Sequence, residues 1–232
     1  MAAETIEEFK KTEGTERLLY KAGQDPCFAA MRIFDEYPTY EVRKGILRVW
    51  RDGARPILPW RANWIETRVC DLKKEDGEIH SGFWKDLLGW YIFSASPESL
   101  KRALEFAIGL VQQEKFREEF GFIYRHDVLK IIAGKIHRSP ETYSEVPAFK
   151  PFLESFLEKD TTFRDFTDVR RAVRCVIDIQ DTDFLPRVEE VLHKLANKRR
   201  NPNNFGDRTD GAEVVAFLRE AMRFLEEMKL EN

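Results

Sequence analysis

The chain has 232 residues and a formal net charge of −3, with 43% hydrophobic and 34% charged residues. This balance excludes a globally disordered chain, and the small net charge does not favour nucleic acid or an anionic membrane as the partner of the whole molecule. The length allows one large domain or two small ones, and either can bury a substantial core.

In the N-terminal third, the sequence pattern predicts short helices with irregular connections. Helical spacing of apolar residues indicates helices over 4–11, 15–21, 27–34, 40–51 and 61–72. Prolines in the segment ARPILPW predict an extended connection before the last of these helices. The polar segment KKEDGEIHSG is the best candidate for an exposed linker, so if the chain has two lobes, we expect them to meet there.

From Phe83 onward the pattern is almost continuously helical. The segment 83–93 is apolar nearly all round, as is typical of a helix covered on more than one side. Ser96 predicts an N-cap, and Pro97 suits the first helical position, where its missing N–H costs nothing. A further helix is therefore expected after Ser96.

Two later segments each indicate a pair of amphipathic helices joined by a polar turn. The clearer pair covers about 167–195, and a weaker pair covers about 126–158. In both pairs the second helix has apolar residues two, five, six and nine positions after its opening proline, Pro147 or Pro186. Such a pair cannot bury its apolar face alone, so the pattern predicts neighbouring pairs stacked on one another.

The pairs recur with a regular period. Asp127, Asp168 and Asp210, which we expect to open three successive helices, are 41 and 42 positions apart. This period resembles the HEAT and armadillo repeat families, and the turn IQDTDFLPRVEEVL is similar to the polar turn inside a HEAT unit. The resemblance implies an all-α fold, a right-handed α-α superhelix of stacked helical pairs, with the unmated helix over 210–229 as a terminal cap.

The predicted organisation is a single helical domain over 1–232. The alternative is an irregular N-terminal helical lobe over 1–75 that packs on a repeat-like region over 82–232. The start MAAETIEEFKK has no apolar run of signal-peptide length, so a cytoplasmic location is the default expectation. No stretch approaches the roughly 20 apolar residues that a membrane span needs.

Helical repeats usually present a concave surface to a partner. On the second helices of the two pairs, the polar positions expected on such a face are Lys150, Glu154, Arg187, Glu190 and Lys194. Their mixed signs favour a protein partner over a polyanion. The leading hypothesis is therefore a non-enzymatic protein–protein interaction module.

The densest positive cluster offers an alternative. Lys198, Arg199, Arg200 and Arg208 lie within eleven positions that contain one acid, Asp207. The cluster could contact phosphates, although basic residues at a helix C-terminus also complement the helix dipole. A nucleic-acid-binding accessory protein that uses this cluster stays open as a second hypothesis.

A third hypothesis comes from the tryptophans. Trp50, Trp60 and Trp64 lie among arginines, a mixture that could stack bases or bind a peptide, although Trp more often fills a core. The segment RANWIETR resembles the aromatic-acid segment of the HEAT-like alkylpurine DNA glycosylases, which carry Trp, Asp and Arg at the lesion site. Here Glu66 stands where that family has Asp.

No complete catalytic or metal-binding motif is present, so we expect no cofactor and no metal, and the sequence leaves enzymatic activity and oligomeric state open. Cys27, Cys70 and Cys175 are far apart and lack a CxxC spacing, which predicts buried reduced thiols. The four histidines have no partner at metal-ligand spacing. Adjacent acid pairs point in different directions on a helix, which is poor geometry for acid–base catalysis.

Overall fold

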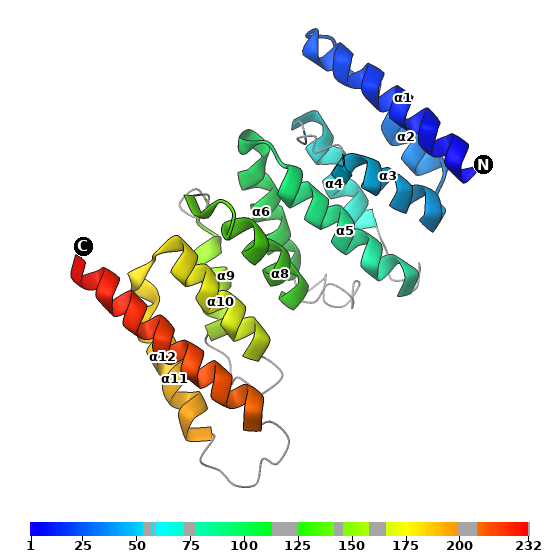
Figure 1. The fold of residues 1–232 in the computed structure, drawn as a ribbon. Helices are drawn as coiled ribbons and strands as arrows, with labels where there is room; N and C mark the ends of the chain where they lie inside the picture. Colours follow the sequence, from blue (N-terminus) through cyan, green and yellow to red (C-terminus); the bar gives the residue numbers. More distant parts are fainter. Residues whose placement is uncertain are drawn as a thin grey trace. The chain divides into compact units, whose positions relative to one another are not determined.

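The computed structural model describes residues 1–52, 57, 59–71, 78–112, 125–141, 146–157, 166–198 and 208–231. Within these ranges the protein has eleven α-helices and no β-strand, which confirms the predicted all-α class (Figure 1). An isolated parallel bridge joins Ile57 to Ala95. The right-handed superhelix stays a prediction.

The chain divides into two compact units, Met1–Leu100 and Lys101–Asn232. The first unit contains α1 (Ala2–Lys21), α2 (Ala29–Glu36), α3 (Tyr40–Asp52), α4 (Pro59–Asp71), α5 (Glu78–Ser94) and the start of α6 (Pro97–Gln112). The second contains the rest of α6, then α8 (Arg125–Ile136), α9 (Phe149–Leu157), α10 (Phe166–Ile179), the 3₁₀ helix η4 (Thr182–Phe184), α11 (Leu185–Lys198) and α12 (Arg208–Glu231). The predicted domain organisation stays a prediction.

One continuous helix, α1, replaces the two helices expected over 4–11 and 15–21. Gly14, in the gap between the two expected helices, lies inside α1, where glycine costs about 1 kcal/mol relative to alanine. Phe9, Glu13 and Glu16 recur at helical spacing and are all fully buried. Packing of this face against α2 and α3 outweighs the low helical propensity of a single glycine.

The linker expected at KKEDGEIHSG is also partly helical. Its second half forms the first turn of α5, which begins at Glu78. The helix expected over 83–93 therefore extends by five residues at its N-terminal end. The first half of that segment lies outside the described residues.

The core of the first unit is built around the Trp50 ring of α3. The helices α1, α2, α4 and α5 each supply one ring to this cluster. The ring centroids lie 5.3 Å from that of Trp50 for Phe9, 6.0 Å for Phe34, 5.9 Å for Trp64 and 4.2 Å for Trp90. Trp50 is fully buried. Because aromatic side chains bury large areas, this cluster joins α1 to α5 into one core.

The helices of the second unit lie in two layers. In the first layer α10 packs between α8 and α12, and in the second layer α9 packs against α11 (Figure 1). The first-layer helices begin at Arg125, Phe166 and Arg208, which keeps the spacing of 41 and 42 residues expected from the sequence. This arrangement is compatible with a helical repeat, whereas membership of the HEAT or armadillo families stays a prediction.

The apolar stripes predicted for the clearer pair lie in this core. Val169, Ala172 and Val173 of α10 are buried, and so are Val188 and the later stripe residues Val191 and Leu195 of α11. Ile177 and Leu192 are half-buried. The register predicted for both helices is confirmed by these positions.

Candidate functional site

The five residues predicted for a concave face lie on two neighbouring helices of the second layer. Lys150 and Glu154 lie one turn apart on α9, and Arg187, Glu190 and Lys194 follow one side of α11. We use the name second-layer surface for the five predicted residues together with the two aspartates of the η4 turn. Its charged members are Lys150, Glu154, Asp181, Asp183, Arg187, Glu190 and Lys194.

Lys150 ties α9 to the turn before α11. Its Nζ donates to Oδ2 of Asp183 at 2.7 Å and lies 3.6 Å from Oδ2 of Asp181. The same ammonium group lies 5.5 Å from the ring centroid of Phe184. The hydrogen bond to Asp183 raises the pKa of Lys150, and the same bond lowers the pKa of Asp183.

Asp181 also shapes this turn. Its Oδ1 accepts a hydrogen bond of 3.0 Å from the backbone N–H of Asp183, and Asp181 is the N-cap of η4. A side-chain acceptor at this position satisfies an amide that has no partner inside the helix. The turn that presents Asp183 to Lys150 is therefore fixed by its own sequence.

Along α11, Glu190 lies between two cations. Lys194 Nζ is 2.9 Å from Glu190 Oε1, and Arg187 Nη1 donates to Glu190 Oε2 at 3.1 Å. The pKa of Glu190 is lowered, first by the hydrogen bond from Lys194 and then by that from Arg187. Exposed charges therefore alternate in sign along this side of the helix.

Glu154 is the one predicted residue that the structure leaves outside these pairs. It is half-buried on α9, and no ion pair joins it to the described residues. Four of the five predicted residues thus take part in two sets of exposed ion pairs, one at the η4 turn and one along α11. Glu154 adds a further carboxylate on α9, one turn after Lys150.

The basic cluster predicted from the sequence is described only at its two ends. Lys198 is the last residue of α11 and Arg208 is the first residue of α12. Arg199 and Arg200 lie in the part that is not described. The role of this cluster stays a prediction.

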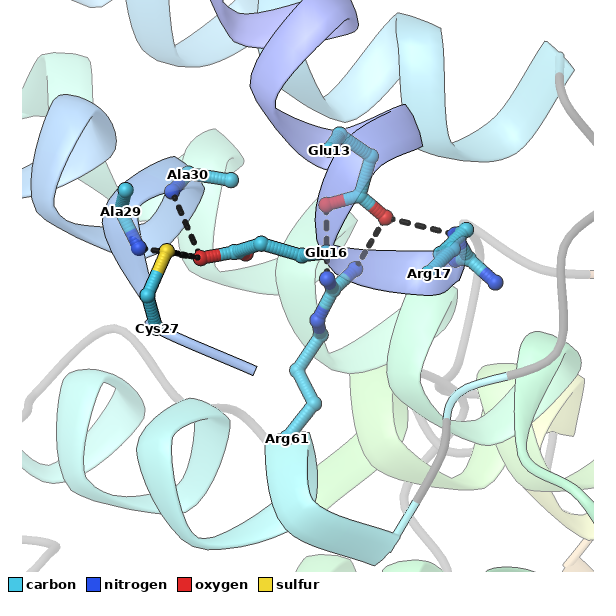
Figure 2. A network of polar contacts seen from close by, with 7 residues as sticks. All are labelled: Glu13, Glu16, Arg17, Cys27, Ala29, Ala30 and Arg61. Atoms are coloured by element: carbon cyan, nitrogen blue, oxygen red, sulfur yellow. Dashed lines mark hydrogen bonds and ion pairs between the residues drawn. The ribbon is translucent and has the colours of Figure 1, made fainter. Parts of the chain in front are cut away.

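A second polar cluster, which the sequence did not predict, is buried in the first unit (Figure 2). Arg61 of α4 donates to both carboxylate oxygens of Glu13 at 2.8 and 2.6 Å, and Arg17 Nε donates to Glu13 Oε1 at 2.7 Å. The side chains of Arg61 and Glu13 are 1% and 0% exposed. Although burial raises the pKa of Glu13, the bonds and charge of Arg61, with a smaller contribution from Arg17, hold it below the usual value.

Glu16, one turn after Glu13, holds the start of α2 (Figure 2). Its Oε1 accepts hydrogen bonds from the backbone N–H groups of Ala29 and Ala30 and from the Cys27 thiol. The N-cap residue of α2, Phe28, has a φ of 57° and makes no side-chain capping bond. A buried carboxylate from α1 therefore supplies the cap that the local sequence lacks.

The segment RANWIETR contributes its side chains to the same unit. Trp64 packs edge-on against Phe34 at 5.0 Å, and Glu66 accepts a hydrogen bond of 2.6 Å from the hydroxyl of Tyr91. Arg68 pairs with Asp35 at 2.7 Å. Together with the buried Arg61, these contacts favour a role in packing for this segment over a lesion site.

The cysteine prediction is wrong at two of its three positions. Cys27 and Cys70 are exposed, and only Cys175 is buried. Desolvation by burial, with the nearby Asp178 as a second cause, raises the pKa of Cys175 to about 12. The spacing of the cysteines argues against metal binding but does not report burial, so it could not separate Cys175 from the other two.

Within the described ranges, no group of three or more His, Cys, Asp or Glu side chains is placed to hold a metal ion. None of the helices in these ranges has the length and apolar composition that a bilayer span requires. His137 and His193 lie near single carboxylates, those of Asp178 at 3.3 Å and Glu189 at 3.7 Å. These are exposed pairs rather than a buried cluster.

Comparison with known proteins gave no match: no family model fits the chain, and no similar sequence or structure was found among curated proteins or solved structures.

Proposed function

We propose that the protein is a non-enzymatic interaction module that binds another protein through the second-layer surface. The observation that carries the proposal is the exposed set of ion pairs in which Lys150 meets Asp183 and Glu190 lies between Arg187 and Lys194. On this surface, cationic hydrogen-bond donors lie next to carboxylate acceptors. Complementary charges on a partner would set its orientation and its register.

The energetics of these pairs support a role in recognition. The Lys150 side chain is 39% exposed and that of Asp183 is 75% exposed, so water screens their attraction. Such pairs contribute little to folding. A partner can therefore exchange them for its own charge-assisted bonds without destabilising the helices beneath.

The distribution of sign favours a protein over a nucleic acid. Carboxylates of Glu154, Asp183 and Glu190 lie among the cations of this surface. A phosphate backbone that approached the cations would meet these carboxylates as well. A protein surface can present both signs and match them.

The direct test is capture of partners from extract of the source cell. Wild-type protein and the variant R187E/K194E are immobilised, and the proteins retained by each are identified and quantified by mass spectrometry. We expect a partner whose capture falls at least about tenfold in the variant, because the row of alternating sign becomes a row of one sign. Retention of the same partners at the same level would contradict the proposal.

A matched control separates this effect from a general loss of positive charge. R219E/R223E reverses the same number of charges at exposed positions of α12, outside the second-layer surface. This control should capture the partner as the wild type does. Circular dichroism of both variants verifies that the helices remain folded.

Two further arms test the alternative hypotheses. Nuclease treatment of the extract should leave capture of the partner unchanged. The nucleic-acid hypothesis would be favoured if nuclease abolished capture and if the purified protein bound oligonucleotides with a steep salt dependence. In that case K198A/R199A/R200A should abolish the oligonucleotide binding. Release of an alkylated base from duplex DNA by the purified protein would favour the glycosylase hypothesis. The interaction module predicts neither result.

A further inference from the structure

Two arginines of α10 share one aromatic ring of α12. The guanidinium carbons of Arg170 and Arg174, one helical turn apart, lie 5.3 and 5.7 Å from the ring centroid of Phe217. Since α10 and α12 pack directly against each other, the ring lies in the seam between two first-layer helices. Two positive groups are thus held close together by one aromatic side chain.

Neither guanidinium has an ion pair among the described residues. The carboxylates nearest to them along α10 are engaged elsewhere, since Asp168 pairs with Arg171 at 3.2 Å and Asp178 pairs with His137 at 3.3 Å. Nε of Arg170 is buried and has no hydrogen-bond partner in the described part of the chain. A desolvated donor on a permanent cation is costly to leave unpaired, and a second cation one turn away adds repulsion.

The flank of α12 that faces this seam is apolar and acidic. Phe224 lies two turns after Phe217 on the same side of the helix and is 41% exposed. Glu213 and Glu220 are exposed on the same flank. The seam therefore combines two unpaired guanidinium groups with exposed aromatic surface, bounded by carboxylates.

We infer that the seam between α10 and α12 is a docking site for a short acidic segment of a protein, in which a carboxylate binds Arg170 and Arg174 and a neighbouring apolar side chain packs on Phe224. Arginine forks match carboxylates in pairs of parallel hydrogen bonds, and the exposed Arg174 with the half-buried Arg170 beside it offers such a fork to a carboxylate. Glu213 and Glu220 disfavour a continuous polyanion, because each phosphate beyond the first would approach a carboxylate. This site lies in the first layer and does not depend on the second-layer surface.

The test uses a fluorescein-labelled degenerate peptide pool in which a single Glu or Asp is flanked by Leu, Ile, Met or Phe and the other positions are uncharged. Fluorescence anisotropy should show saturable binding to the wild type, and R170Q/R174Q should weaken it at least about tenfold, since both charge-assisted bonds are lost. R170K/R174K keeps the charge but lacks the planar fork, so it should bind with intermediate affinity. A matching pool with Asn or Gln in place of the acids should bind poorly.

Controls separate this site from general charge and from the second-layer surface. R219Q/R223Q removes two exposed positive charges from α12 and should leave peptide binding unchanged, and so should R187E/K194E. R174Q alone, at an exposed position, serves as the test variant if R170Q/R174Q does not fold by circular dichroism. No saturable binding up to millimolar peptide, equal binding by the variant, or equally strong competition by inorganic phosphate or a single-stranded oligonucleotide would overturn the inference.

Discussion

Glu13 and Arg61 are 48 positions apart in the chain, yet their side chains form two parallel hydrogen bonds inside the first unit. The pair joins α1 to α4, and Arg17 supplies a second cation to Glu13. The guanidinium group of Arg61 also lies 5.3 Å from the centroid of Trp50, so the ionic pair borders the aromatic core. The Glu13 carboxylate of α1 therefore holds the arginine that packs beside Trp50.

Removal of one partner of this pair should destabilise the protein strongly. Arg61→Met leaves the buried carboxylate of Glu13 with Arg17 alone, and we expect a loss of about 3–5 kcal/mol in the free energy of unfolding, measured by urea denaturation. The double variant E13M/R61M removes both charges and should recover much of that loss. A double variant less stable than R61M would contradict this account of the pair.

Acid should weaken the same contact. Because the folded-state pKa of Glu13 is lowered, its contribution to stability is present above its pKa in the unfolded chain and is lost as the pH falls through the lowered value. Denaturation curves at a series of acidic pH values should show a smaller pH slope for Glu13→Gln than for the wild type. Equal slopes would mean that Glu13 is not the carboxylate responsible.

The core register of α10 predicts opposite results at adjacent positions. Val173 is fully buried, so Val173→Asp should cost several kcal/mol and leave the protein unfolded or aggregated. Arg174 is exposed, and Arg174→Ala should cost no more than about 1 kcal/mol through its contact with Phe217. Thermal melting measured for both variants tests the register, and two wild-type melting temperatures would show it to be wrong.

Thiol labelling should divide the cysteines by burial. Cys27 and Cys70 are exposed and should react with iodoacetamide in the native protein. Cys175 is buried with a pKa of about 12, so little thiolate is available and it should react only after unfolding. Peptide mapping by mass spectrometry reads all three sites, and native labelling of Cys175 would contradict the packing of α10.

The second unit was predictable because its stripes are strongly periodic. Val169, Val173 and Val188 follow the helical spacing without interruption, and the positions that open successive first helices keep a constant interval. The charged positions of the second-layer surface follow from the same register, since they lie opposite the stripes. The pairing of Lys150 with Asp183 depends on the η4 turn, which no periodic pattern describes.

The buried cluster of the first unit was missed for a physical reason. Charged residues are rarely fully buried, so Glu13 and Glu16 were assigned no core position. The first expected helix, over 4–11, also ended before Glu13, which separated both carboxylates from Phe9. Had α1 been predicted as one helix, the spacing of Phe9, Glu13 and Glu16 would have placed two carboxylates on its packed face.

The partners of the arginines and tryptophans in the first unit could not be predicted from the sequence either. Composition alone could not show which arginine meets which acid, because Arg61 and Glu13 are distant in sequence. Long-range pairs of this kind arise from tertiary packing and leave no local signal. For the tryptophans, the sequence indicated only that such side chains often fill a core, and it did not predict the cluster around Trp50.

The most direct test of the interaction hypothesis is protection of two lysines by the captured partner. Lys150 and Lys194 are each 39% exposed, and Lys130 on α8 is an exposed lysine of the other layer. Brief acetylation of the free protein and of its complex, read by mass spectrometry, should show Lys150 and Lys194 protected in the complex and Lys130 equally reactive in both. Unchanged acetylation of Lys150 and Lys194 in a complex that remains assembled would contradict the proposed surface.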